Sequence, residues 1–222
     1  MESTFLESNE GGTKMKNIAS FWFRILGFLI DWLIHMLLLL ALILWVSTSS
    51  TMEEATNRFL TFLIIDFFYS IGFAFFNPYL ISRFGGTIGK LLTGTRIVNP
   101  EGKKVNFYRA FFRNHIGYMI SASLFWIGFI WILIDKERRS WHDQIANTYV
   151  VKVNKTMFIV GIAALAILLG TYGYLVNSTV KNFSANSGIY MNFLKSIETK
   201  PQQTKTPTTE QLKLKSSPVK VQ

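Results

Sequence analysis

Three ionisable side chains stand inside the first long apolar stretch of the sequence, which runs from about residue 19 to 46. Arg24, Asp31 and His35 are seven and four residues apart, so on an α-helix they lie on one face. Asp31 would lie about 10 Å further along the helix than Arg24, where a carboxylate in lipid requires a partner or water. A base, an acid and an imidazole in this arrangement could transfer protons or bind a cation within a membrane. They could equally form a structural pair that fixes the position of the helix.

Two more aspartates extend this set. Asp66 lies in the middle of a second apolar stretch, where a carboxylate again needs a partner. Asp143 lies in the segment 141–151, and it could either cap a short helix or reach Arg24. The role of His35 stays open between a proton relay and a simple hydrogen bond within a helical bundle.

A glycine-rich segment that also contains lysine follows the second apolar stretch. Its candidate motif consists of Gly86, Thr87, Gly89, Lys90, Gly94 and Arg96. A phosphate-binding loop of the pattern G-x-x-x-x-G-K-[ST] would need glycine at Phe84 and a hydroxyl residue at Leu91, so that interpretation fails. The sequence instead favours a turn beside the membrane with a short amphipathic helix.

Apolar stretches dominate the chain that must position these residues. Its 222 residues are 50% hydrophobic and include 20 phenylalanines and 6 tryptophans, a composition that suits lipid better than water. About 20 apolar residues are enough for a helix to span a bilayer, and the stretches at 19–46, 59–81 and 157–176 reach that length. We therefore predict an all-α integral membrane protein with three to four transmembrane helices and a cytoplasmic glycine- and lysine-rich loop.

The apolar run at 107–134 has two interpretations. As one straight helix it would form a fourth span, and the basic residues Lys136, Arg138 and Arg139 would then lie outside, against the positive-inside rule. The alternative, which we favour, is a pair of shorter helices that turn near residues 121–123 as a re-entrant or interfacial hairpin. Such a turn is stable at membrane depth only where protein covers it.

The charge distribution indicates the partners and the orientation of the chain. The net charge is +10, but Lys and Arg lie beside apolar stretches, which favours a lipid bilayer with anionic headgroups over nucleic acid. The linker 47–57 contains Glu53 and Glu54 and no Lys or Arg, so we expect a multi-pass protein of the cell membrane with a cytoplasmic N-terminus. The predicted organisation is a polar N-terminal segment (1–17), a transmembrane domain (18–152), an additional C-terminal transmembrane helix (153–176) and a polar, disordered tail (177–222).

These residues resemble the RDD family of bacterial membrane proteins, which is named for one arginine and two aspartates. Arg24 and Asp31 match the arginine and the first aspartate, and Asp143 matches the second. The segment 86–98 is similar to the glycine–lysine loop of the family, and the resemblance covers about residues 18–152. Asn147 stands where the family usually has glycine. The resemblance implies a role in transport, with sodium/proton antiport proposed for some members.

Two functions of different classes follow as hypotheses. The first is a homo-oligomeric transporter of sodium ions or protons, in which Asp31 alternates between pairing with Arg24 and binding the cation. The second is a membrane scaffold or assembly partner that transports nothing and whose charges hold its helices in register. We expect no enzymatic activity and no catalytic, cofactor-binding or metal site, because the chain lacks cysteine and His142 has no second histidine at ligand spacing.

Overall fold

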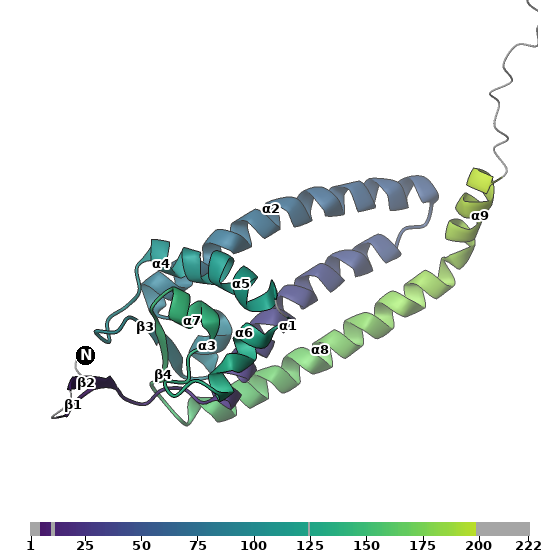
Figure 1. The fold of residues 1–222 in the computed structure, drawn as a ribbon. Helices are drawn as coiled ribbons and strands as arrows, with labels where there is room; N and C mark the ends of the chain where they lie inside the picture. The colour runs from purple at the N-terminus through teal and green to yellow at the C-terminus, as the bar shows by residue number, and fades with distance from the viewer. Residues whose placement is uncertain (1–4, 10–11, 124, 199–222) are drawn as a thin grey trace, which may run out of the picture.

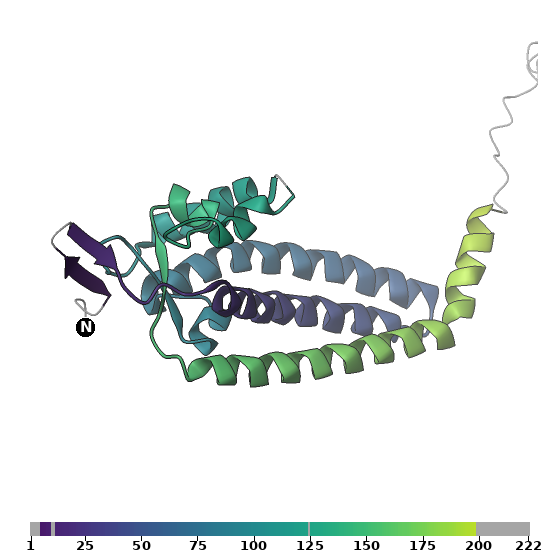
Figure 2. The ribbon, with the colours of Figure 1, turned by 60° about the horizontal axis from the view of Figure 1, so that its bottom comes forward.

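Three long apolar helices form the stem of the molecule in a computed structural model, which describes residues 5–9, 12–123 and 125–198. They are α1 (Phe21–Ser47), α2 (Met52–Phe84) and α8 (Met157–Ala185), and they lie side by side in Figures 1 and 2. Each is long and apolar enough to cross a membrane, which confirms the prediction of three to four spanning helices. Their apolar side chains remain widely exposed, as lipid-facing helices require.

The limits of α2 follow from capping residues. The hydroxyl of Thr51 accepts a hydrogen bond from the backbone N–H of Glu54 at the start of the helix. At the other end Gly85 adopts a φ of 84°, a left-handed conformation that glycine tolerates and that ends the helix. The chain therefore leaves the stem at the first residues of the glycine-rich segment.

The C-terminal helix is longer than the sequence indicated. The prediction ended the last span at Val176 and placed a disordered tail from residue 177 onward, but α8 continues to Ala185 and a further helix, α9, spans Ser187–Glu198. The prediction of a disordered tail is therefore wrong for residues 177–198. Polar residues such as Asn177 and Thr179 continue the helical turns that the apolar run begins. The rest of the predicted tail, 199–222, lies outside the described residues.

The apolar run at 107–134 is bent, as predicted, and is not one straight helix; we call its two arms the hairpin. Its first arm comprises α4 (Phe107–Phe112), the π-helix η1 (Arg113–Gly117) and α5 (Tyr118–Ser123), and its second arm comprises α6 (Ile127–Ile130) and η2 (Trp131–Leu133). The two arms are bent by 107° at the break after Ser123. The turn lies where the sequence placed it.

Short elements gather at the end of the stem where α1 and α8 begin and α2 ends (Figure 1). They are α3 (Ile88–Leu92), β3 (Thr95–Val98), α7 (Trp141–Ile145) and β4 (Tyr149–Lys152). β3 and β4 pair antiparallel, with Thr95 opposite Lys152. Ala19, Ile81, Ile97, Val105, Ala110 and Val150 form the buried core beneath them.

The all-α prediction needs one amendment. The molecule is mainly helical, but it also has the β3–β4 pair and, within the polar N-terminal segment, β1 (Leu6–Asn9) paired with β2 (Gly12–Met15). Figure 2 shows this N-terminal hairpin beside the short elements, whereas α9 lies at the opposite end of the stem. The N-terminal strands, α3, α7 and the β3–β4 pair therefore lie together at one end of the stem, which we call the polar end.

Candidate functional site

Asp143 is the centre of the polar end. It lies on α7, and its side chain has no exposed surface. Ser140 begins the helix with a capping box, in which its backbone N–H donates to Asp143 Oδ2 at 3.3 Å and its side chain lies against the backbone N–H of Asp143. The Ser140 hydroxyl also donates to Oδ2 at 2.6 Å. Thus one of the two roles that the sequence allowed for Asp143, helix capping, is present.

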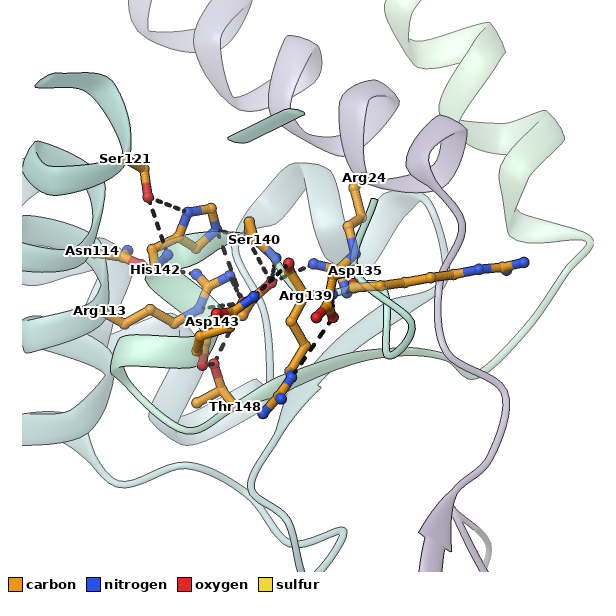
Figure 3. Close-up of polar contacts among 12 residues, drawn as sticks. Arg24, Arg113, Asn114, Ser121, Asp135, Arg139, Ser140, His142, Asp143 and Thr148 are labelled. Atoms are coloured by element: carbon orange, nitrogen blue, oxygen red, sulfur yellow. Dashed lines mark hydrogen bonds and ion pairs between the residues drawn. The ribbon is translucent and has the colours of Figure 1, made fainter. Parts of the chain in front are cut away.

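The second role is present as well, because two arginines converge on the same carboxylate (Figure 3). Arg113 donates to Asp143 Oδ1 from Nε at 3.0 Å and from Nη2 at 2.6 Å. Arg24 donates to Oδ2 from Nη1, and its Nη2 donates to the carbonyl of Arg138 at 2.7 Å. Asp143 with these two arginines, which we call the Arg–Asp–Arg cluster, ties α1, η1 and α7 together.

The electrostatics of this cluster fix its charge state. Burial opposes ionisation of Asp143, but Arg113 and Arg24 outweigh it and hold the pKa of the carboxyl well below its usual value. For His142, burial lowers the pKa of the imidazole well below its usual value; Asp143 opposes this shift and the nearby arginines add to it. Asp143 is therefore ionised at neutral pH while its neighbour His142 is uncharged.

Local backbone features bring the cluster together. Arg113 opens the π-helix η1, a widened turn that often occurs at functional sites. At the end of this turn Gly117 lies against α7, because a Cβ there would be 2.9 Å from the Cβ of His142. Both ring nitrogens of His142 lie within hydrogen-bond distance of a serine hydroxyl. Nδ1 is 3.2 Å from Ser121 Oγ, and Nε2 is 2.8 Å from Ser140 Oγ. Ser121 thus joins the first arm of the hairpin to α7, while Ser140, the N-cap of α7, holds the other side of the imidazole.

Asp31 does not pair with Arg24, and that structural prediction is wrong. The hydroxyl of Thr87 donates to Asp31 Oδ2 at 2.5 Å, and the backbone N–H of Gly89 donates to Oδ1 at 2.7 Å. This contact needs two glycines, because a Cβ on Gly89 would collide with the carbonyl oxygen of Gly27 on α1. Asp31 therefore binds the glycine-rich segment through uncharged donors, and the hypothesis of an Asp31 that alternates with Arg24 loses its basis.

The remaining predicted residues of the stem lie along the contact between α1 and α2. His35 Nδ1 is 3.1 Å from the hydroxyl of Tyr69, and its ring also contacts Phe73. Asp66 is half-buried one turn from Tyr69 on α2, and no hydrogen bond or ion pair joins its side chain to another described residue.

A cavity of about 160 Å³ connects several of these groups at the level of Asp31 and His35. We call it the polar cavity, because its wall includes Asp31, His35, Asn77, Thr87, Lys90, Asn114 and Tyr118. Lys90 is buried, yet its ammonium group makes no hydrogen bond or ion pair with any described residue. An acid, a base and an imidazole therefore surround one space large enough for water or a small cation.

The glycine–lysine motif mainly shapes the backbone around these groups. Gly86 is buried with Lys90 packed close to it, and Gly94 has a φ of 68° and no room for a Cβ beside Asn154. Arg96 lies outside both the polar cavity and the Arg–Asp–Arg cluster, where its Nη1 donates to the carbonyl of Thr95 at 3.0 Å. Burial lowers the pKa of the Arg96 guanidinium. Of this motif, Thr87, Gly89 and Lys90 reach the candidate site.

Sequence reasoning missed Arg113, the second cation of the cluster. It stands within the aromatic run 107–118. An arginine in such a run needs a buried acid as its partner, and this signal could have paired it with Asp143. Asn77, Asn114 and Tyr118 of the polar cavity carried no comparable signal, because amides and phenols are common in helical bundles.

Comparison with known proteins gives a family match. The protein-family model described as RDD family matches residues 18–147 of the chain. Uncharacterized protein YxaI of Bacillus subtilis (strain 168) is 28% identical over 151 residues, which is 62% of this chain and 99% of that protein. From the same strain, uncharacterized protein YckC is 31% identical over 60% of this chain and 83% of its own, and uncharacterized membrane protein YteJ is 31% identical over 60% and 80%. No solved structure matches the chain.

Proposed function

This chain belongs to the RDD family, and we propose that it moves protons or sodium ions across the cell membrane through the polar cavity. The observation that carries the proposal is the state of Asp31. Its carboxylate is held by a hydroxyl and a backbone N–H, and no described cation lies within ion-pair distance. A carboxylate without a fixed counter-ion can accept a proton or a cation, whereas one held by two guanidinium groups cannot.

The groups around Asp31 support a path along the stem. His35 follows Asp31 by one helical turn on α1 and contacts Tyr69 on α2. Asp66 lies one turn further along α2, away from the polar end. Titratable side chains therefore succeed one another from the glycine-rich segment into the stem, an arrangement that suits proton transfer.

The orientation and the assembly are part of the same proposal. The polar end carries most of the Lys and Arg residues, which favours the cytoplasmic side and a cytoplasmic N-terminus. Three spanning helices enclose little volume, so we expect a homo-oligomer in which neighbouring copies cover the open side of α2. We assign the chain no enzymatic reaction and no nucleic-acid partner.

The test is ion flux in liposomes that contain the purified protein and a pH-sensitive dye. Wild-type protein should exchange protons when sodium, potassium or lithium is added in turn, and the active cation identifies the substrate. Asp31→Asn should abolish the exchange, while Asp135→Asn, which changes an aspartate outside the polar cavity, should retain it.

Folding must be separated from function in that experiment. Each variant is compared with the wild type by its thermal midpoint in detergent, and His35→Gln provides a second variant that leaves the contacts of Asp31 intact. Exchange that persists in well-folded Asp31→Asn protein rules the proposed path out.

A scaffold without transport is the second candidate, and the Arg–Asp–Arg cluster favours it. All three charges of that cluster are used internally, which is how a protein fixes the position of its helices. If wild-type liposomes exchange no cation faster than protein-free liposomes, the scaffold replaces the transporter. The widely exposed apolar faces of the stem would then be the surface for partner helices.

A further inference from the structure

A second and larger cavity lies beside the Arg–Asp–Arg cluster. Its volume is about 300 Å³, at the lower end of the roughly 300–1,000 Å³ that is usual for ligand pockets. The first turns of α1, the helix α3, both arms of the hairpin and α7 enclose it. We call it the basic cavity, because three basic side chains, Arg24, Lys90 and Arg113, contribute to its wall and no acidic side chain does.

The charge of the basic cavity is not fully compensated. Asp143 lies outside its wall and neutralises one of the two arginines that bind it. Lys90 is only 6% exposed, and its ammonium group has no hydrogen bond or ion pair with a described residue. The buried Nε of Arg24 also lacks a hydrogen-bond partner. Burying a cation without a partner costs free energy, so these basic groups favour an anionic ligand.

The rest of the basic cavity is apolar. Phe21, Ile25 and Phe28 of α1 line it together with Phe129 and Ile130 of the hairpin, and the ring centroids of Phe28 and Phe129 are 6.3 Å apart. Burial also lowers the pKa of His142 in the wall well below its usual value, so this imidazole adds no positive charge at neutral pH. A small inorganic anion would leave these apolar surfaces in contact with water. A ligand that fits both parts has a negative headgroup and a hydrocarbon chain.

The tip of the hairpin indicates where such a ligand comes from. Trp126 lines the basic cavity and is still 54% exposed, and the adjacent Phe125 is 91% exposed. Both residues have positive φ values, 48° for Phe125 and 64° for Trp126, a conformation that costs energy in aromatic residues and marks functional sites. Exposed aromatic residues are enriched at membrane interfaces, which favours a position of the cavity mouth beside lipid.

We propose that the basic cavity binds one single-chain anionic amphiphile from the membrane, with its headgroup at Lys90 and its chain along the apolar wall that includes Phe21, Ile25 and Trp126. The shared chemistry is a carboxylate or a phosphate monoester on a hydrocarbon chain. A two-chain phospholipid is too bulky for a volume of this size. The two cavities share Lys90 in their walls, but the inference does not rest on the proposed ion path, because binding requires no ion gradient.

The experiment measures equilibrium binding of a fluorescent polyene fatty acid to purified protein in a non-ionic detergent. Binding should raise the probe fluorescence and quench tryptophan emission, since Trp126 lines the cavity. The alcohol of the same chain length should bind at least about tenfold more weakly than the acid, because it lacks the charge that Lys90 compensates. This comparison uses wild-type protein and does not depend on the folding of a variant.

Variants and competitors complete the test. Lys90→Gln should weaken acid binding about tenfold and leave alcohol binding unchanged, while Lys155→Gln, which alters an exposed lysine, should change neither. A long-chain fatty acid and an alkyl phosphate should displace the probe, whereas inorganic phosphate and a two-chain phosphatidic acid should not. Equal affinity for acid and alcohol, an unaffected Lys90→Gln protein, or displacement by inorganic phosphate alone would overturn the proposal.

Discussion

Two aspartates at the polar end have opposite surroundings. Asp143 is fully buried and accepts hydrogen bonds from two guanidinium groups, whereas Asp31 is half-buried and accepts from the hydroxyl of Thr87 and the backbone N–H of Gly89. The Asp143 carboxylate is locked in its charged form by Arg113 and Arg24. Asp31 borders an open space instead. The charge of the hydrogen-bond partners, more than the degree of burial, therefore distinguishes a structural carboxylate from one that can exchange a proton or a cation.

The largest loss of stability should come from removing the negative charge of Asp143. Asp143→Asn leaves Arg24 and Arg113 buried without a counter-ion, so the free energy of unfolding should fall by about 3–5 kcal/mol. Glu137→Gln, which alters the more exposed ion pair with Arg139, should cost less than about 1 kcal/mol. Unfolding in mixed detergent micelles measures both. A cost for Asp143→Asn as small as that for Glu137→Gln would mean that the cluster does not hold the fold.

The next effect concerns the backbone contact that places Asp31. Gly89→Ala would press a methyl group against the carbonyl of Gly27 and should lower the free energy of unfolding by about 1–3 kcal/mol. Gly170→Ala on α8 is the matched control, since nothing lies within 4 Å of its Cβ position. Helix propensity predicts that this control is neutral or stabilising by up to about 1 kcal/mol. Equal thermal midpoints for both variants would contradict the close contact between α1 and α3.

A smaller effect should appear in the dependence of stability on pH. Burial lowers the pKa of His142, so the unfolded chain binds a proton below about pH 6.5 that the folded chain does not bind. The free energy of unfolding should therefore decrease as pH falls from 7 to 5, by up to about 1.4 kcal/mol per pH unit. The lowered pKa of Asp143 acts in the same direction, but only below about pH 4, where the unfolded carboxyl gains its proton.

His142→Gln separates these two windows. This variant should lose the decrease between pH 7 and 5 and retain the decrease at lower pH, because Asp143 is unchanged. Chemical unfolding at a series of pH values is the measurement. An unaltered slope above pH 5 in His142→Gln would show that another group binds the proton.

The sequence predicted the stem well because apolar length alone determines which helices can span a bilayer. It also predicted the hairpin, since the basic residues after 134 conflict with a straight crossing. It failed at the partner of Asp31. Helical spacing put Arg24 and Asp31 on one face. Spacing within one helix says nothing about Asp143, which binds Arg24, or about Thr87, which binds Asp31, because both partners lie on other parts of the chain.

The end of the last helix was missed for a related reason. Asn177, Ser178 and Thr179 lower the local hydropathy, and composition then favoured a tail. The helix continues through them because its turns are already formed when the apolar stretch ends. The two cavities could not be predicted at all, since each is lined by residues from several elements that are distant in sequence.

The most direct test of the contrast between the two aspartates is infrared difference spectroscopy of reconstituted protein with isotope-labelled aspartate, recorded on addition of the transported cation. If Asp31 binds the cation, a carboxyl band should change when the cation is added. This change should be absent in Asp31→Asn and present in Asp135→Asn. The account predicts no contribution from Asp143, whose charge is held by two arginines. A cation-dependent carboxyl signal that survives unchanged in Asp31→Asn protein would contradict it.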